Sequence, residues 1–333
     1  NYRLSVSNQD QTGMVPNTDQ KKNSITLNAG INITSKLKVG GSGTYTVTKN
    51  DNIMGSGYTS AGILQSLSQW FGRQVDTKYL KDNWQEIDPV SGRNVNWNHS
   101  YHDNPYWTVN KNTNSRSRER IIGNVNLSYD ITDWIQFRTM VGIDAYSQHI
   151  KQVRAKDSHD WMDGRFDNYE SVRSEVTANA VFTFDKTVGD FDFLGTLGTE
   201  YNHYDYRSDN TYVDALIIPD LYATSNAAVA ARTGMSETQW ELQSVFASLN
   251  VGFRDFLYLD LTARNDWSST LPIDNNSYFY PSASLGFVLT EALGIQSNIL
   301  SYAKLRGSYA QVGGSANPYS LLGTYNVSNP FDG

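Results

Sequence analysis

The chain has 333 residues, a formal net charge of -7 and no cysteine. The lack of cysteine excludes a disulfide framework and a thiolate metal site, and the mild negative charge argues against a nucleic-acid-binding protein. Hydrophobic residues make up 39% of the chain and aromatic residues 13%, and no apolar run approaches the roughly 18 residues of a membrane-spanning helix.

Apolar and polar residues alternate along most of the chain, which is the pattern of β-strands with one apolar face. Segment 1–8 reads as a strand, and five pairs of segments follow it. In the first pair, 24–33 and 37–47, a short turn separates two alternating runs, which predicts an antiparallel hairpin. The other predicted pairs are 123–131 with 135–143, 176–184 with 191–201, 245–253 with 257–263, and 279–289 with 303–309.

Connections of two kinds join these eleven predicted strands. One kind is a short turn and the other is a long loop, and long loops are uncommon inside compact domains and usually carry function. Short turns at one end and long loops at the other are typical of an outer-membrane β-barrel. The short turns are expected near 34–37, 130–134, 185–190 and 253–256. The long loops are expected at 9–21, 49–117, 147–171, 206–237 and 266–277.

Aromatic residues sort to the two ends of the apolar faces, around an aliphatic middle. Two such belts match the two interfaces of a bilayer, and a soluble β protein has no reason to sort its aromatics in this way. The sequence therefore predicts an all-β, antiparallel transmembrane barrel with long extracellular loops and short periplasmic turns. The belt at the turn end comprises Tyr129, Phe184, Phe191 and Phe253. The belt at the loop end comprises Tyr45, Tyr201, Phe279 and Tyr309.

The other face of the last strands is charged, and we expect it to line the lumen of the barrel. Arg264 and Asp266 alternate with apolar residues in one strand, and Lys304 and Arg306 do so in another. Ion pairs among such lumen-facing residues are the expected role. Pro281 follows an aromatic run, and its missing N–H predicts a bulge or a locally open strand pair.

The longest loop contains one predicted helix. Thr59 and Ser60 can cap a segment in which Ile63, Leu67 and Trp70 recur at helical spacing. The simpler interpretation is that its apolar face packs on neighbouring loops, and the alternative is that it docks a partner or lines a ligand chamber. Exposed aromatics of the long loops are candidate ligand contacts through ring stacking. These candidates are Trp84, Trp97, Tyr106, Trp107 and Trp161.

No catalytic constellation is found, so the sequence predicts a protein that is not an enzyme and needs no cofactor. The five histidines lack metal-ligand spacing, and neither a GxSxG motif nor a phosphate-binding loop occurs. No metal site is predicted beyond one weak calcium candidate, in which oxygen ligands surround Gly164. Its residues would be Asp157, Asp160, Asp163 and Asp167.

Three stretches near the end of the chain carry a family resemblance: Arg264–Pro272 (RNDWSSTLP), Tyr278–Glu291 (YFYPSASLGFVLTE) and Leu300–Leu321. Together with His102–Trp107 (HDNPYW) and the segment Arg116–Tyr146, they resemble the SusC/RagA family of TonB-dependent outer-membrane transporters of Bacteroidetes. The resemblance implies a 22-stranded barrel closed by an N-terminal plug, with which the lumen-facing charges could also pair. We expect residues 1–333 to be an internal portion of that barrel, because no plug, TonB box, signal peptide or terminal strands are recognised.

The resemblance also implies a function and partners. It predicts energised import of a glycan or an oligopeptide across the outer membrane. A SusD-like surface lipoprotein would act as the lid, and TonB, ExbB and ExbD would act through the missing N-terminal region. Outer-membrane lipid would surround the strands, and no nucleic acid is involved. A passive porin or adhesin-like barrel is the first alternative, and a soluble glycan-binding β protein is the second.

Overall fold

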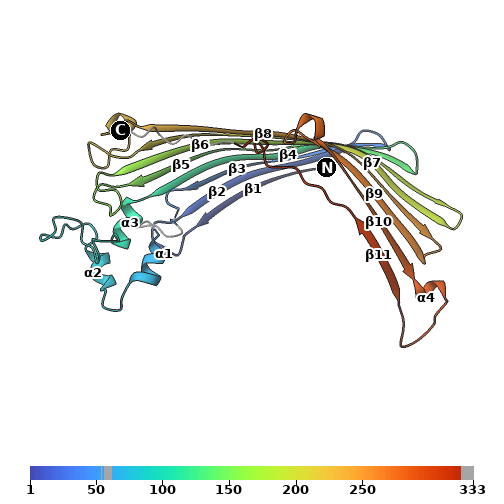
Figure 1. The fold of residues 1–333 in the computed structure, drawn as a ribbon, viewed down its shortest axis with the longest axis horizontal. Coiled ribbons are helices and arrows are strands. Elements are labelled where there is room, and N and C mark those ends of the chain that lie inside the picture. The colour runs from blue at the N-terminus through green and yellow to red at the C-terminus, as the bar shows by residue number, and fades with distance from the viewer. Residues whose placement is uncertain (54, 56–61, 324–333) are drawn as a thin grey trace.

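The computed structural model describes residues 1–53, 55 and 62–323. In this part of the chain, eleven strands form one antiparallel sheet in which each strand pairs with its neighbours in sequence (Figure 1). The predicted number and order of strands are confirmed. The strands are β1 (Tyr2–Gln11), β2 (Gln20–Asn32), β3 (Leu37–Asn50), β4 (Asn114–Asp130), β5 (Ile135–Arg154), β6 (Arg165–Val188), β7 (Phe191–Val213), β8 (Arg232–Phe253), β9 (Leu257–Ser268), β10 (Ser277–Val288) and β11 (Lys304–Ala310).

Helices are short and confined to the connections between strands. The predicted helix of the longest loop is present after residue 62, whereas Thr59 and Ser60 lie outside the described residues. No helix in the described part of the chain is both long and apolar enough to cross a membrane. The helices are α1 (Ile63–Gln65), the π-helical turn η1 (Ser66–Trp70), α2 (Thr77–Asp82), α3 (Pro105–Lys111), the 3-10 turns η2 (Thr224–Asn226) and η3 (Ile273–Asn275), and α4 (Leu289–Ala292).

The sheet is curved, and its two faces carry different side chains. Ser244 and Asp266 are buried although no second layer of strands or helices covers the middle of the sheet in the described ranges (Figure 1), which assigns their polar face to the concave side, where side chains of a curved sheet converge. Apolar side chains such as Val125, Leu197 and Leu285 splay outward on the opposite face and stay exposed. A soluble protein would bury such a face against another layer. An exposed apolar face is instead expected for strands that contact lipid.

The apolar residues of the convex face form a band with sharp edges. In β7 the band runs from Phe191 to Tyr201, a length that suits a tilted strand crossing a bilayer, which needs about 9–11 residues. At the loop end, the hydroxyl of Tyr45 donates to Glu119 at 2.9 Å, and the hydroxyl of Tyr201 donates to Glu241 at 2.9 Å. These tyrosine–glutamate pairs mark the level at which the convex face turns polar.

This band crosses the hydrogen-bonded rows of the sheet obliquely. Following strand partners across β5, β6 and β7, Glu119 of β4 is aligned with Glu237 of β8. Glu237 lies four residues before Glu241, at which the band ends in β8. At the turn end, Asp130 shares its row with Ser248, whereas β8 continues to Phe253. Between β4 and β8, both edges of the band are therefore displaced toward the turn end, by a similar number of residues, relative to the aligned strand partners. Strands that tilt in a membrane-spanning barrel require this displacement.

Several strands continue far beyond the band at the loop end. β6, β7 and β8 contain 24, 23 and 22 residues. The predicted loops 147–171 and 206–237 were therefore too long, because much of each is strand. Beyond the band neither face is apolar, so the ladder hydrogen bonds continue while the alternation that reveals a strand in the sequence disappears.

Pro281 causes no bulge, contrary to one of the two predicted accommodations. The register between β9 and β10 is unbroken on both sides of the Pro281–Ala263 pair. The carbonyl of Pro281 accepts the N–H of Gln311 at 3.0 Å, so its backbone polar groups point to the side of β11. The last β11 residue in the ladder is Ala310, opposite Ser282. The missing N–H thus faces the position at which this strand pair ends.

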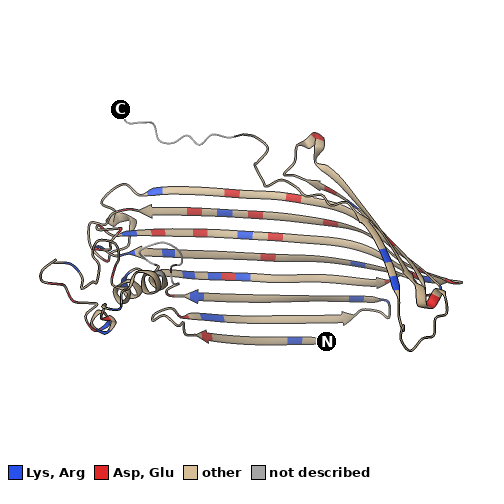
Figure 2. Ribbon diagram, turned by 60° about the horizontal axis from the view of Figure 1, so that its bottom comes forward, with Lys and Arg blue, Asp and Glu red and all other residues tan. Residues whose placement is uncertain are grey.

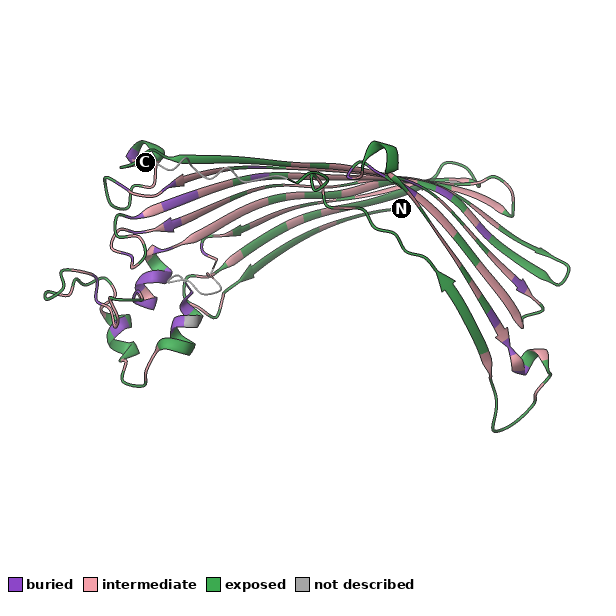
Figure 3. Cartoon of the chain, in the orientation of Figure 1, coloured by how far each residue is buried: buried purple, intermediate pink, exposed green. Residues whose placement is uncertain are grey.

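The segment with α1, α2 and α3 lies beneath the loop end of the sheet, on the concave side (Figure 1). We call residues 62–113 the loop module. Burial is concentrated in this module and at the loop ends of the strands, whereas most of the sheet is half-buried or exposed (Figure 3). A second small core joins β6, β7 and the β7–β8 loop. It consists of Phe166, Val213 and Leu216, with Tyr222 and Ala227 packed against it.

Candidate functional site

A cluster of paired charges lies on the concave face of β7 to β10. The Arg264 guanidinium donates to Asp266 at 2.7 Å, to Glu200 at 3.2 Å and to the Ser244 hydroxyl at 2.7 Å. The Tyr280 hydroxyl also donates to Asp266, which is only 4% exposed. The predicted pairing of Arg264 with Asp266 is present, and the structure adds Glu200 and Tyr280. The cluster joins four strands and holds two carboxylates that would otherwise lack compensation.

The other two residues predicted to face the lumen lie on β11. The Lys304 ammonium stands 4.8 Å from the centre of the Tyr258 ring, as in a cation–π contact. Arg306 lies two residues further along the same face, in register with Gly286. Within residues 1–323 as described, neither forms an ion pair with a carboxylate. Their predicted role in the lumen stays a prediction.

A second cluster of charges, not predicted from the sequence, lies on β4, β5 and β6. Arg120 pairs with Asp144 at 2.5 Å, and Arg173 pairs with both Asp144 at 3.8 Å and Glu175. Charged residues of both signs are spread along these strands (Figure 2). Arg116, Arg118 and Arg120 occupy alternate positions of β4, and this period of two is the signal from which the cluster could have been found.

Asn104 organises the loop module. Its side chain is completely buried; its Nδ2 donates to the carbonyls of Leu80 at 3.0 Å and Val95 at 2.9 Å. Its Oδ1 accepts the N–H of Tyr106 at 3.0 Å. Asn104 is the N-cap of α3, and Pro105 follows at the first helical position. One side chain therefore ties α2, the segment before α3 and α3 itself together.

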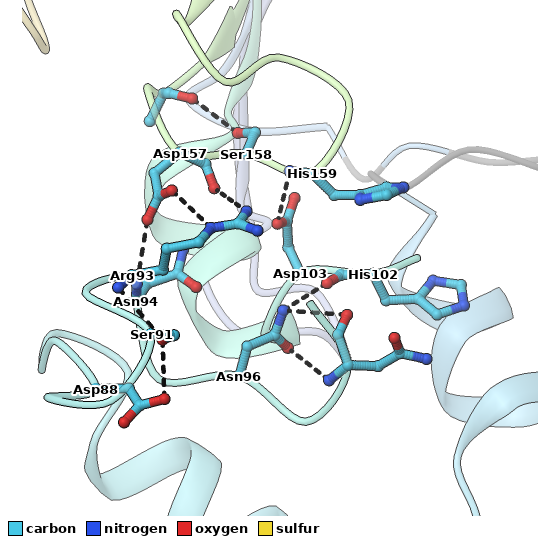
Figure 4. A network of polar contacts seen from close by, with 12 residues as sticks. Asp88, Ser91, Arg93, Asn94, Asn96, His102, Asp103, Asp157, Ser158 and His159 are labelled. Carbon is cyan, nitrogen blue, oxygen red and sulfur yellow. Dashed lines mark hydrogen bonds and ion pairs between the residues drawn. The ribbon is translucent and has the colours of Figure 1, made fainter. Parts of the chain in front are cut away.

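Asp103 connects the loop module to the β5–β6 loop, residues 155–164 (Figure 4). It is 3% exposed, and its Oδ1 accepts the N–H of His159 at 2.9 Å. Its Oδ2 is buried and has no hydrogen-bond partner among the described residues. Burial raises the pKa of Asp103 to about 7, although the hydrogen bond from His159 opposes this effect. Asp103 thus connects two segments that are distant in sequence and titrates near neutral pH.

Asp157 forms a second connection between the same two segments. The Arg93 Nε donates to its Oδ1 at 2.8 Å, and the N–H of Asn94 donates to its Oδ2 at 3.1 Å (Figure 4). The side chains of Arg93 and Asp157 are both less than one-third exposed. We call the contacts of Asp103 and Asp157 across these two segments the latch. The latch fixes the loop module against the loop end of the sheet.

The four aspartates of the weak calcium candidate do not converge. Asp157 is bound by Arg93, Asp167 pairs with Arg165 at 2.9 Å, and Asp160 lies 3.5 Å from the ring of His159. In the described residues, no group of three or more His, Cys, Asp or Glu side chains could hold a metal ion. The arrangement of Asp157, Asp160, Asp163 and Asp167 therefore does not support a calcium site, and arginines already pair with Asp157 and Asp167.

The predicted ligand-binding aromatics are dispersed over the loops. Trp97 stacks on His102, with ring centres 5.1 Å apart, and meets Phe71 edge-on at 4.4 Å. Trp107 is only 6% exposed, which favours a packing role. Trp161 lies 5.3 Å from the Arg154 guanidinium. Trp84 and Tyr106 are half-buried. No ring contact joins any two of the five predicted residues in the described structure, and their contact with a ligand stays a prediction.

Comparisons with known proteins agree over nearly the whole chain, although no family model matches it. TonB-dependent receptor P3 of Formosa agariphila is 23% identical over 98% of this chain and 32% of that receptor. TonB-dependent receptor P26 of the same organism is 24% identical over 98% of this chain and 33% of its own length. The RagAB peptide importer in its open-open state superposes with a TM-score of 0.73 at 18% identity, covering 93% of this chain and 34% of that chain.

The predicted resemblance to TonB-dependent transporters of the SusC/RagA type is confirmed. The chain has the fold of part of a TonB-dependent transporter barrel, and it spans about one-third of the length of the curated receptors it matches. The receptor and transporter names agree with the lack of a catalytic motif in the sequence. In this TonB-dependent barrel fold, the latch and the two charge clusters occupy the concave wall and its loop end.

Replacing Asn104 should loosen the loop module of this TonB-dependent barrel portion. Asn104→Ala removes two donors and one acceptor and leaves buried backbone groups without partners, at a cost of about 2–4 kcal/mol in local stability. Amide hydrogen exchange in residues 77–113 of the full-length protein measures the loss. The control is Asn110→Ala, because Asn110 is exposed and only donates to the Tyr106 carbonyl. Equal protection in the two variants would contradict the role given to Asn104.

The latch should weaken as pH rises. Because burial raises the folded pKa of Asp103 from 3.8 to about 7, its contribution to the latch is fully present below about pH 4, declines as pH rises from there, and is lost above about pH 7. The loss amounts to roughly 4 kcal/mol. Hydrogen exchange in residues 155–164, corrected for its intrinsic pH dependence, should reveal it in the full-length protein.

Asp103→Asn should remove most of this pH dependence, since the amide is isosteric and does not titrate. Asp88→Asn is the control within the loop module. The pKa of Asp88 is lowered by the hydrogen bond from the N–H of Val90, so Asp88 stays ionised at neutral pH. If Asp103→Asn retained the wild-type pH profile, the carboxyl of Asp103 would not be the titrating group.

Proposed function

We propose that this chain is a barrel portion of an outer-membrane transporter that imports a large nutrient, a glycan or an oligopeptide, with energy supplied through TonB. The observation that carries the proposal is an oblique apolar band of membrane thickness on a sheet whose sequence and fold match TonB-dependent receptors over nearly the whole chain. The chain works by binding and gated passage rather than by bond chemistry.

The concave wall has the composition expected of a transport lumen. Paired charges such as Arg264 with Asp266 rigidify it without presenting a bare charge to the solute. The loop module lies at the loop end of this wall, where a solute enters from outside (Figure 1). A SusD-like surface lipoprotein would cover that opening, and TonB with ExbB and ExbD would act on parts of the polypeptide outside residues 1–333. The RagAB structures, described as a peptide importer, support a peptide as one of the two substrate classes.

Growth of deletion strains tests the proposed function. A strain lacking the full-length gene should lose growth on either an oligopeptide mixture or a complex glycan, and loss of TonB should remove growth on the same nutrient. A passive porin would allow uptake without TonB, so TonB-independent uptake contradicts active import. Recovery of the full-length protein in the soluble fraction would support the soluble glycan-binding alternative, although the exposed apolar face disfavours it.

A further inference from the structure

Three arginines follow one another at alternate positions on the concave face of β4. Arg116, Arg118 and Arg120 share one side of the strand because side chains of a strand alternate between faces. Arg120 pairs with Asp144, which also contacts Arg173 of β6, so this side is the one with the second charge cluster. Guanidinium groups two residues apart on one strand repel one another unless anions separate them.

The carboxylates nearby do not balance these arginines. Asp144 and Glu175 are taken by Arg120 and Arg173. Glu119 points to the convex face, where it accepts the Tyr45 hydroxyl. In the described residues, four guanidinium groups therefore meet two carboxylates on this part of the concave wall. The excess of positive charge is local, because the chain as a whole has a net charge of -7.

Arg116 and Arg118 are the two members without a carboxylate. Arg118 donates from Nε and Nη2 to the Gln148 side-chain oxygen at 2.8 and 2.5 Å. Arg116 donates from Nη2 to the Asn50 side-chain oxygen at 3.4 Å, and its Nε is buried without a partner in the described structure. Neutral amides orient these guanidinium groups but leave their charge uncompensated. An anionic group would complete both hydrogen bonding and charge.

The surroundings suit a solute that comes from the loop end. The Arg118 guanidinium lies 4.6 Å from the centre of the Tyr146 ring, which restricts its orientation. At the start of β4, the N–H of Asn114 donates to Asn52 at 2.9 Å, so the chain leading to the loop module lies directly beside Arg116. Both arginines are half-buried and keep some access to solvent. They lie at the level where the convex face turns polar, at the loop-side rim of the apolar band.

We propose that Arg116 and Arg118 form an anion subsite of the lumen wall, which binds a carboxylate or sulfate group of the imported molecule. This inference rests on the proposed import function and narrows its substrate to acidic peptides or acidic glycans. Planar guanidinium forks bind either anion through paired N–H···O bonds. The two sources share this oxygen chemistry, so two probes are needed to tell them apart.

Binding to the purified full-length protein tests the subsite. The probes are hexaglutamate and a sulfated hexasaccharide, with maltohexaose as the neutral control, titrated calorimetrically at low and at high ionic strength. At least one acidic probe should bind, and high salt should weaken it. The double variant Arg116→Gln/Arg118→Gln should weaken binding at least about tenfold, since charge-assisted hydrogen bonds are lost. Preference for one probe identifies the acidic peptide or the sulfated glycan as the source.

Two further variants separate charge from folding. Arg116→Lys/Arg118→Lys keeps the charge and should retain most of the salt-sensitive binding. Arg207→Gln removes a paired arginine from the convex face and should leave binding unchanged. The subsite is refuted if neither acidic probe binds, because another part of the polypeptide then occupies the arginines, or if the glutamine variant binds as well as wild type. TonB-dependent growth that persists in that case would leave the import function standing.

Discussion

Val141→Arg is expected to destabilise the assembled barrel by about 2–4 kcal/mol, as measured for arginine on the lipid face near the bilayer midplane. Val141 lies in the middle of the apolar band of β5, and its side chain is 53% exposed on the convex face. The cost arises because lipid cannot solvate the guanidinium, which must either reach the interface or draw water into the hydrocarbon.

Met140→Arg is the matched control for this substitution. Met140 is the adjacent residue of the same strand, but it lies on the concave face in register with Asn126 and Asn179. An arginine there meets amides and water, so we expect a much smaller loss. Reversible unfolding of the full-length protein from lipid vesicles gives both values. Equal losses for the two variants would mean that the convex face does not contact lipid.

Arg264→Ala should have the second large effect, a loss of about 2–4 kcal/mol in the free energy of unfolding. The substitution leaves Asp266 and Glu200, on either side of Ser244, without their shared cation, and Asp266 is almost fully buried. The penalty comes mainly from the uncompensated buried carboxylate rather than from the lost attraction. Denaturant unfolding in the same vesicles measures the loss.

Two variants test the physical reason for this loss. Adding Asp266→Asn to Arg264→Ala removes the buried charge and should recover part of the stability. Arg254→Ala breaks an exposed pair between the β8–β9 turn, which contains Arg254, and Asp190 of the β6–β7 turn, and should cost less than about 1 kcal/mol. If Arg254→Ala were as damaging as Arg264→Ala, burial of the Arg264 cluster would not explain its contribution.

The strands of the apolar band could be predicted from the sequence because one face of each strand contacts an apolar environment and the other does not. Val125, Leu127 and Tyr129 of β4 alternate with Asn124, Asn126 and Ser128, and this period alone indicates a strand. Beyond the band, both faces of β6 and β7 are polar. Backbone pairing continues there without any pattern in the side chains, so the sequence suggested loops where the structure has strands.

Part of the candidate site could likewise be predicted from the sequence, and part could not. Arg264 and Asp266 were predictable because they share the polar parity of one strand. The latch was not, because Asp103 meets His159 and Arg93 meets Asp157 across more than fifty residues of chain. Pro281 was half predicted: its missing N–H requires an open position, and only the extent of β11 shows that the end of a strand pair provides it without a bulge.

The central claim is that the sheet crosses a membrane with its convex face in lipid and its concave face in water. Because the 333 residues contain no cysteine, single cysteines can be introduced at each position from 138 to 144 in β5 of the full-length protein and spin-labelled in lipid vesicles. Collision with oxygen, which concentrates in lipid, should be highest at 139, 141 and 143. Collision with a water-soluble nickel chelate should be highest at 138, 140, 142 and 144. Accessibility without this period of two, or with the chelate favoured at the odd positions, would contradict the account.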